Sequence, residues 1–365
     1  MNSYGGYTMK ESLNTVSAVP TAKYNRAWLI GVLLFFIVVV IGLFWAKWNP
    51  YYHKAFIAAH DHAIGSSSIS GEDQTAPSPS WKASWDFSIG YFQSIWKAYL
   101  VAIILSSLVQ VALPKDWIRR ILGKTSYGST VLAGLCALPG MMCTCCAAPL
   151  VVGMRKQSSS VSATVAFWLG NTALNPAVLI FMIFTLGWKF TLLRLIFGII
   201  IVFGVSYLAG RIAVKNSDIQ PFVDSSEQIP QAGFGRRWVK SIGSILFATV
   251  PLYILSVFVL GAFRAWLFPT IGADWGNSLL IVLLFAVVGT LFVIPTAGEI
   301  PIIQTFINFG LGGGPAAVLA IVLPVISLPS ALMVRKALSW RVLGFLGLSV
   351  AVLGVVAGGI GTLFL

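Results

Sequence analysis

The chain has 365 residues, of which 57% are hydrophobic and 10% are charged, and its formal net charge is +13. Soluble domains carry about 25% charged residues, so this composition excludes an ordinary soluble protein. The uncharged blocks 157–188 and 300–334 are longer than the roughly 20 apolar residues that a helix needs to cross the hydrocarbon of a bilayer. We therefore expect an all-α integral membrane protein.

The first apolar block, Trp28–Ala46, resembles a signal peptide only superficially. It is longer than the roughly 7–15 residues of a signal-peptide core, and no small-residue cleavage site follows before Lys47. We interpret it as a retained first transmembrane helix. The positive charge does not indicate a nucleic-acid partner, because Lys and Arg concentrate in the cytoplasmic loops of membrane proteins.

The remaining sequence contains two related stretches. Each has a long apolar span, a segment broken by Pro and Gly, a span that begins again at a proline, and a last span ending the unit. The corresponding landmarks are Pro149 and Pro301, then Pro176 and Pro329, then Trp188 and Trp340. Because the proline spacings nearly match, we predict an internal repeat.

We predict that the broken segments Tyr127–Met154 and Asn277–Gly310 are re-entrant hairpins, which leaves about seven full transmembrane helices. Each repeat then crosses the membrane an odd number of times, so the second is inverted relative to the first. The basic residues agree with this topology and with a bacterial inner-membrane protein whose N-terminus is cytoplasmic. Counting the hairpins as full spans is the alternative.

This topology divides the chain into six parts. They are a cytoplasmic N-terminal tail (1–27), a first transmembrane helix (28–48), an extracytoplasmic loop (49–94), a first transport repeat (95–215), a cytoplasmic linker (216–237) and a second transport repeat (238–365).

The segment Pro139–Pro149 is the strongest local signal, because it places three cysteines, Cys143, Cys145 and Cys146, at a helix break. Transporters place substrate sites at such breaks near the middle of the membrane, and thiolates select soft ions and metalloids. Two alternatives remain open. Cysteines pack as small apolar residues, and the spacing of Cys143 and Cys146 is also that of a redox pair.

The second break, Pro295–Pro301, contains Glu299, a carboxylate deep in an apolar region. An ionisable group at that depth costs about 2.5–3.5 kcal/mol and is a functional candidate. No basic residue stands near it in the sequence, so we expect an unpaired carboxylate that carries a coupling proton or contacts a cationic substrate group. Its alternative role is to cap the helix that restarts there.

Asn171, Thr172 and Asn175 follow the first break at helical spacing, and Ser327 and Ser330 occupy the corresponding part of the second repeat. Asn171, Asn175 and Ser327 are candidate substrate ligands. Alternatively, these side chains satisfy the backbone groups that Pro176 and Pro329 release.

The residues from Pro139 through Cys143-Thr-Cys145-Cys146 to Pro149, with Asn175-Pro176, Glu299-Ile-Pro301 and Gly310-Leu-Gly-Gly-Gly314, resemble a predicted-permease family. That family includes organoarsenical efflux permeases and proposed exporters of soft metals, and the likeness covers roughly Trp96 to Arg341. The resemblance implies a permease whose cysteines lie at or near the substrate path. Its motif usually reads Pro-x-Cys-Ser-Cys-Gly-x-x-Pro, whereas here Thr144 replaces Ser and Cys146 replaces Gly. A third thiol of this kind suits a different soft ion.

We therefore predict a permease, not an enzyme, that exports a small thiophilic metalloid or soft metal. Its partners are this small-molecule or ion substrate and the lipid bilayer, with no cofactor, no resident metal and no nucleic acid. The oligomeric state is not predicted. No P-loop occurs, so the chain itself does not hydrolyse ATP. The alternatives are a channel or uptake permease for a small sulfur-containing anion, and a membrane thiol oxidoreductase.

Overall fold

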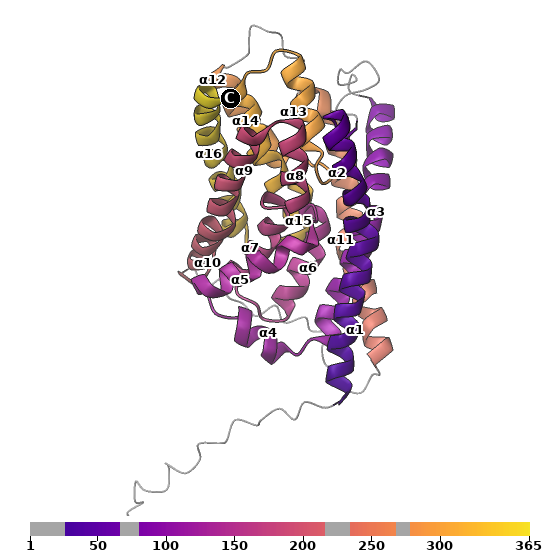
Figure 1. The fold of residues 1–365 in the computed structure, drawn as a ribbon. Helices are drawn as coiled ribbons and strands as arrows, with labels where there is room; N and C mark the ends of the chain where they lie inside the picture. Colours follow the sequence, from indigo (N-terminus) through magenta and orange to yellow (C-terminus); the bar gives the residue numbers. More distant parts are fainter. Residues whose placement is uncertain (1–25, 66–79, 216–233, 268–277) are drawn as a thin grey trace, which may run out of the picture.

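The computed structural model describes residues 26–65, 80–215, 234–267 and 278–365, and in these ranges the regular structure is helical, with no strand. The long helices run roughly side by side and enclose shorter, interrupted helices (Figure 1). The expected tail (1–27) and linker (216–237) lie mostly outside the described residues.

Helices follow one another in chain order with short connections. Before residue 216 they are α1 (Arg26–Leu43), η1 (Phe44–Trp48), α2 (Asn49–Asp61), α3 (Trp81–Ala112), α4 (Lys115–Leu122), α5 (Tyr127–Ala137), η2 (Leu138–Gly140), α6 (Thr144–Lys156), α7 (Val161–Ala173), α8 (Pro176–Thr185), α9 (Trp188–Ile199), η3 (Ile200–Val205) and α10 (Ser206–Lys215). After residue 233 they are α11 (Phe234–Leu267), α12 (Leu279–Leu291), α13 (Glu299–Asn308), α14 (Gly313–Val325), α15 (Leu328–Val334) and α16 (Trp340–Phe364).

Six helical stretches in the described ranges are long and apolar enough to cross a membrane. They are Gly31–Asp61, Trp81–Ala112, Val161–Thr185, Trp188–Lys215, Gly235–Phe263 and Trp340–Phe364. The seventh crossing that we expected corresponds to α14 and α15. These two helices are separate because the chain is extended at Ile326 and Ser327, and Ser327 caps the start of α15.

The loop expected at 49–94 is in large part helical, which corrects its boundaries. The first helix continues through η1 and α2 to Asp61, and α3 already begins at Trp81. The Ser80 hydroxyl caps α3 by accepting a hydrogen bond from the Ala83 amide at 3.1 Å. Low hydropathy suggested a loop here, but helices continue beyond the apolar stretch that crosses the bilayer.

In both broken segments, two helices are joined by a connection that contains non-helical residues. The first consists of α5, η2 and α6, and the second of α12 and α13. In Figure 1, α4 and α5 lie toward the lower end of the bundle, whereas α12, α13 and the C-terminus lie toward the upper end. The most extensive helix–helix contacts are those of α3 with α11 and of α14 with α16. Helix α6 packs against both α3 and α15.

Each break contains one non-glycine residue in the left-handed backbone region, Met141 (φ 48°) in the first and Ala297 (φ 69°) in the second. This conformation costs an L-residue roughly 1–2 kcal/mol, because Cβ approaches the following carbonyl. Such strain persists where the surrounding structure fixes it, and it clusters at functional sites.

Ala297→Gly should therefore leave the protein equally stable or raise its free energy of unfolding by up to about 1 kcal/mol, since relief of strain exceeds the entropic cost of glycine. Ala297→Val should destabilise it, because a branched side chain is strained by the left-handed backbone at this buried position. Thermal unfolding of the detergent-purified variants measures both. Equal melting temperatures for the two variants would show that the left-handed backbone at residue 297 stores no strain.

Candidate functional site

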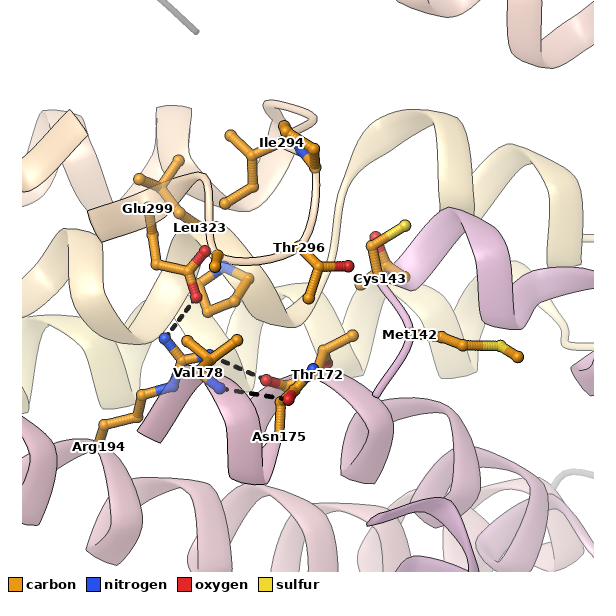
Figure 2. Close-up of a pocket in the computed structure, with 14 residues that line it drawn as sticks. Met142, Cys143, Thr172, Asn175, Val178, Arg194, Ile294, Thr296, Glu299 and Leu323 are labelled. Carbon is orange, nitrogen blue, oxygen red and sulfur yellow. Dashed lines mark hydrogen bonds and ion pairs between the residues drawn. The ribbon is translucent and has the colours of Figure 1, made fainter. Parts of the chain in front are cut away.

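A cavity lies where the two breaks, the broken span α7–α8 and helix α14 meet. The first break contributes Cys143, the second break Thr296 and Glu299, and the broken span α7–α8 contributes Asn175 (Figure 2). The remaining lining residues are Met142, Thr144, Thr172, Val178, Arg194, Ile294, Pro295, Ala297, Leu323 and Pro324. The cavity has room for about one water molecule. The conformation is thus nearly closed.

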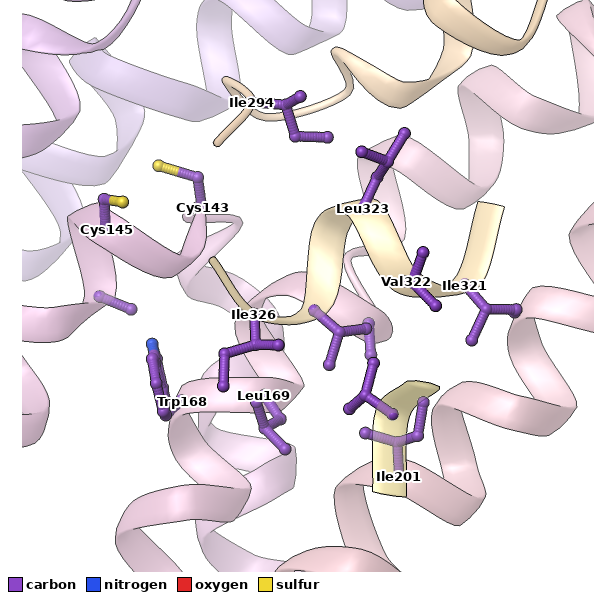
Figure 3. Packing of buried hydrophobic residues seen from close by; sticks show 14 of the residues in the cluster. Cys143, Cys145, Trp168, Leu169, Ile201, Ile294, Ile321, Val322, Leu323 and Ile326 are labelled. Atoms are coloured by element: carbon purple, nitrogen blue, oxygen red, sulfur yellow. The ribbon is translucent and has the colours of Figure 1, made fainter. Parts of the chain in front are cut away.

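Two of the three clustered cysteines form a pair. The sulfurs of Cys143 and Cys146 are 2.9 Å apart, and both side chains are buried. The Cys145 sulfur faces elsewhere, 3.6 Å from the Ser327 hydroxyl. Figure 3 shows Cys143 and Cys145 at the edge of a packed apolar core that includes Trp168. A pair of thiols, with a separate third thiol, therefore replaces the three-sulfur cluster that the sequence suggested.

Cys143 precedes α6 as its N-cap and has no side-chain capping bond. The first turn of α6 therefore directs its amide groups toward the break, where helix dipoles favour negative charge. The Trp168 indole fixes this turn from the other side by donating a hydrogen bond to the Thr144 carbonyl at 3.0 Å.

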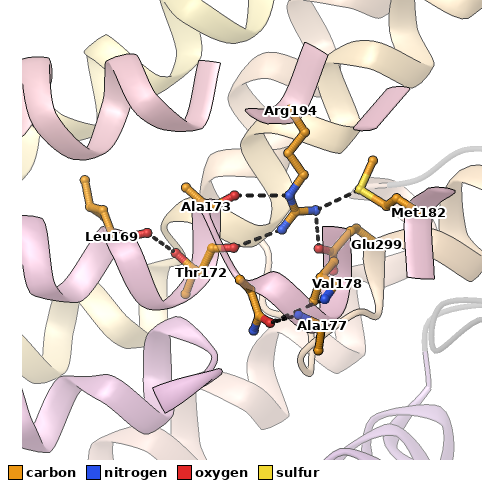
Figure 4. A network of polar contacts seen from close by, with 9 residues as sticks. Leu169, Thr172, Ala173, Ala177, Val178, Met182, Arg194 and Glu299 are labelled. Carbon is orange, nitrogen blue, oxygen red and sulfur yellow. Dashed lines mark hydrogen bonds and ion pairs between the residues drawn. The ribbon is translucent and has the colours of Figure 1, made fainter. Parts of the chain in front are cut away.

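Glu299 is not unpaired as we expected. Its Oε1 lies 2.5 Å from Nη1 of Arg194, and both side chains are almost completely buried. Arg194 belongs to α9, and the same guanidinium donates hydrogen bonds to the carbonyls of Thr172 at 2.9 Å and Ala173 at 3.3 Å (Figure 4). These carbonyls end α7, where a cation also meets the negative end of the helix dipole. The sequence-based expectation was wrong because Arg194 is distant from Glu299 in the chain.

The polar candidates of the broken spans have structural partners as well. Asn175 caps α8, with Oδ1 accepting hydrogen bonds from the amides of Ala177 and Val178. Asn171 donates to the Phe167 carbonyl at 2.9 Å. Ser327 caps α15 in a reciprocal bond with Ser330, and its hydroxyl also lies 3.3 Å from that of Thr144.

Some polar atoms at the cavity nevertheless have no protein partner. Within the described ranges, these include Nδ2 of Asn175 and Oε2 of Glu299, both buried and both on residues that line the cavity. Asn171 Oδ1 is also unpartnered and lies against Gly140, where even a Cβ would come within 2.3 Å of it. Buried polar groups are normally hydrogen-bonded, so one free donor and one free acceptor face the cavity.

Of the predicted site residues, Cys143, Asn175 and Glu299 line the cavity. Cys145, Cys146 and Ser327 are not in the lining but contact Thr144 or Cys143. Asn171 also lies outside the lining, against Gly140 and the Phe167 carbonyl. Two residues were missed, Arg194 and Lys47. Arg194 ends an uncharged block, and Lys47 lies between Trp45 and Trp48, so both had the pattern of a membrane-interface residue.

Lys47 is buried with 6% of its surface exposed. Its ammonium donates hydrogen bonds to the hydroxyls of Tyr51 at 2.8 Å and Thr296 at 3.0 Å. Thr296 lines the cavity, so the first helix brings a basic group to the wall of the site. Within the part of the chain that the structure describes, no three His, Cys, Asp or Glu side chains form a group that can hold a metal ion.

The sequence matches the ArsP_1 family, described as predicted permeases, over residues 81–362. The chain belongs to this family. It is 46% identical to the UPF0718 protein YraQ of Escherichia coli (strain K12) over 91% of this chain and 94% of that protein. It is 22% identical to the UPF0718 protein MJ0584 of Methanocaldococcus jannaschii over 72% of this chain and 91% of that protein.

No solved structure is significantly similar to the chain. The family match confirms the resemblance drawn from the two breaks, and together with the six apolar spans it makes the chain a multi-pass membrane protein of a permease family. The matched region begins at α3, so the helical stretch containing Lys47 lies outside it.

Proposed function

We propose that this permease exports a small thiophilic metalloid or soft-metal species through the cavity between the two breaks. The observation that carries the proposal is the meeting of both breaks, the broken span α7–α8 and helix α14 at one cavity lined by Cys143. Secondary transporters bind substrates at such discontinuous helices. The chain acts as a carrier, and the thiols bind substrate reversibly instead of catalysing a reaction.

The side chains at the cavity match this substrate chemistry. Cys143 and Cys146 lie close enough for one soft atom to bind both sulfurs. Asn175 Nδ2 supplies a hydrogen-bond donor and Glu299 Oε2 an acceptor, which suits a substrate with oxygen ligands on its soft atom. Asn171, Cys145 and Ser327 hold the surrounding backbone and hydroxyl groups in place.

We also propose that the two transport repeats, 95–215 and 238–365, are inverted relative to each other. The opposite placement of the two hairpins in the bundle supports this arrangement (Figure 1). Basic residues of α4 and the ends of α6 and α10 lie toward the lower end in that view. By the positive-inside rule this end is cytoplasmic, together with the N-terminal tail, and the protein resides in the bacterial inner membrane.

The test is the growth of bacterial cells with and without the protein in a panel of toxic compounds that includes trivalent arsenicals, antimonite, Cu(I) and Zn(II). Cells that make the protein should tolerate at least one thiophilic compound at a concentration several-fold higher, and should accumulate less of it. Equal growth and equal accumulation across the whole panel would refute export of thiophilic substrates.

A further inference from the structure

Lys47 lies in η1, a short π-helical segment between α1 and α2. π-Helical turns are rare and occur frequently at functional sites. In a transmembrane segment, a basic side chain normally extends toward water, but the Lys47 side chain is buried against the second break. Its two hydrogen bonds, to Tyr51 and Thr296, use two of the three donors of the ammonium.

The same segment contacts both breaks. The Trp48 indole donates a hydrogen bond to the carbonyl of Pro139 in the first break at 2.8 Å, while Lys47 contacts Thr296 in the second. One turn later, the Tyr51 ring packs edge-on against Phe181 of α8, with ring centroids 5.8 Å apart. The first helical stretch therefore closes one side of the site, and its ammonium lies where the two breaks meet.

Among the described side chains, the charged groups near the cavity are one ion pair and one further basic group, Lys47. Arg194 and Glu299 neutralise each other. No ion pair joins Lys47 to a carboxylate anywhere in the described residues, and the hydrogen-bond partners of its ammonium are the neutral hydroxyls of Tyr51 and Thr296. The uncapped N-terminus of α6 adds a partial positive charge on the same side. Lys47 is therefore a buried basic group without a carboxylate partner in the described residues, and an ionisable group at membrane depth is a functional candidate.

We propose that Lys47 determines substrate specificity by selecting a small anion that carries a soft atom. The anionic part is held near the ammonium of Lys47 and the hydroxyl of Thr296, and the soft atom is reached by the Cys143–Cys146 pair. This inference deepens the proposed function, since it narrows thiophilic substrates to anionic ones. A neutral or cationic soft species lacks the charge that this wall of the cavity attracts.

The cysteine thiolates are the competing partner for Lys47, so the test must separate attraction of an external anion from formation of a thiolate. Iodoacetate and iodoacetamide are nearly the same size and both alkylate thiolates, but only iodoacetate is anionic. Both alkylation rates at Cys143 are proportional to the fraction of thiolate, so this fraction drops out of their ratio. The ratio therefore measures how strongly the site attracts a small anion. The measurement uses full-length protein in detergent with Cys136 replaced by serine, and mass spectrometry to assign the modified cysteine.

Lys47→Gln should lower the iodoacetate-to-iodoacetamide ratio about tenfold, and Lys47→Arg should keep the ratio within about twofold. Lys97→Gln is the matched control, because Lys97 is exposed and its ammonium lies 5.4 Å from the Trp45 ring centre, beside the same segment. A ratio that is unchanged in Lys47→Gln, or is lowered equally in Lys97→Gln, overturns the proposal. A fall in both rates with a constant ratio shows that Lys47 serves the thiolates and also overturns it.

Thermal unfolding with and without thiosulfate, a small anion with a soft sulfur, tests binding without alkylation. Millimolar thiosulfate should raise the melting temperature of the wild type and of Lys47→Arg, but not that of Lys47→Gln. If neither reagent labels Cys143 in the wild type and thiosulfate causes no shift, the proposal is overturned. If the cellular growth panel is negative, only the export of thiophilic substrates is refuted. The anion selectivity of Lys47 is tested separately, because the ratio of alkylation rates and the shift in melting temperature require no transport.

Discussion

Glu299→Gln is expected to destabilise the folded protein by about 3–5 kcal/mol, because removing one partner of a buried ion pair leaves the other charge uncompensated. The loss falls on Arg194, which is 1% exposed and has no second carboxylate within 4 Å in the described ranges. The guanidinium keeps its bonds to the Thr172 and Ala173 carbonyls, so it stays buried in the variant.

Thermal unfolding of the purified variants measures this effect. A double-mutant cycle with Arg194→Gln should give a coupling energy of about 1–3 kcal/mol, since each single variant leaves one buried charge and the double variant leaves none. Lys189→Gln is the control, because Lys189 lies on the same helix but is exposed and bonds only a backbone carbonyl near the C-terminus. If Glu299→Gln unfolds at the same temperature as the wild type, the Arg194–Glu299 pair contributes no stability.

This ion pair also joins parts of the chain that the proposed mechanism must move apart. Arg194 belongs to α9 in the first repeat and Glu299 to α13 in the second. While Oε1 is bonded to Arg194, only Oε2 remains for a substrate or a proton. If Glu299 carries a proton during transport, protonation at Oε2 removes the negative charge that attracts Arg194, so proton loading weakens the pair and favours separation of the two helices.

The breaks were the most predictable part of the molecule. Proline and glycine disrupt helices for local reasons, so the sequence located an interruption in each segment, at Pro139–Pro149 and Pro295–Pro301. In the structure the non-helical residues lie in the first part of each segment, since Pro149 and Pro301 are inside α6 and α13, and both interruptions contribute to one cavity. The membrane-spanning helices were equally visible, because apolar length is a property of the sequence itself. The same local reasoning identified Cys143, Asn175 and Glu299, each of which is the first residue of a helix or directly precedes one.

The charged partners were not predictable in the same way. Pairing of Arg194 with Glu299 depends on how α9 packs beside the second hairpin, and no local pattern encodes that contact. Lys47 resembled an interfacial lysine, since tryptophans flank it on both sides. Only the path of η1 along the two breaks shows that its ammonium points into the protein. A lone basic residue inside a long apolar helix was the available signal, and it was assigned to the membrane surface.

The largest functional effect is expected when either cysteine of the Cys143–Cys146 pair is replaced by serine. Cys143→Ser and Cys146→Ser should each lower the affinity for a thiophilic substrate by about 10²-fold or more, because the second thiol binds at a high effective concentration once the first has bound. Serine is slightly smaller than cysteine and its hydroxyl is a poor ligand for soft atoms, so the variants should fold. Substrate-dependent shifts in melting temperature and efflux from cells measure the loss.

Two other cysteines provide controls of different kinds. Cys136→Ser should change nothing, since Cys136 is exposed and lies on α5 away from the cavity lining. Cys145→Ser should lower affinity by less than about tenfold, because its sulfur faces the Ser327 hydroxyl and not the Cys143–Cys146 pair. If Cys145→Ser abolishes binding as completely as Cys143→Ser, then all three thiols bind the substrate together and the cavity must rearrange to bring them into contact. If Cys143→Ser retains wild-type affinity, the thiols pack the break and the substrate is held by its polar groups alone.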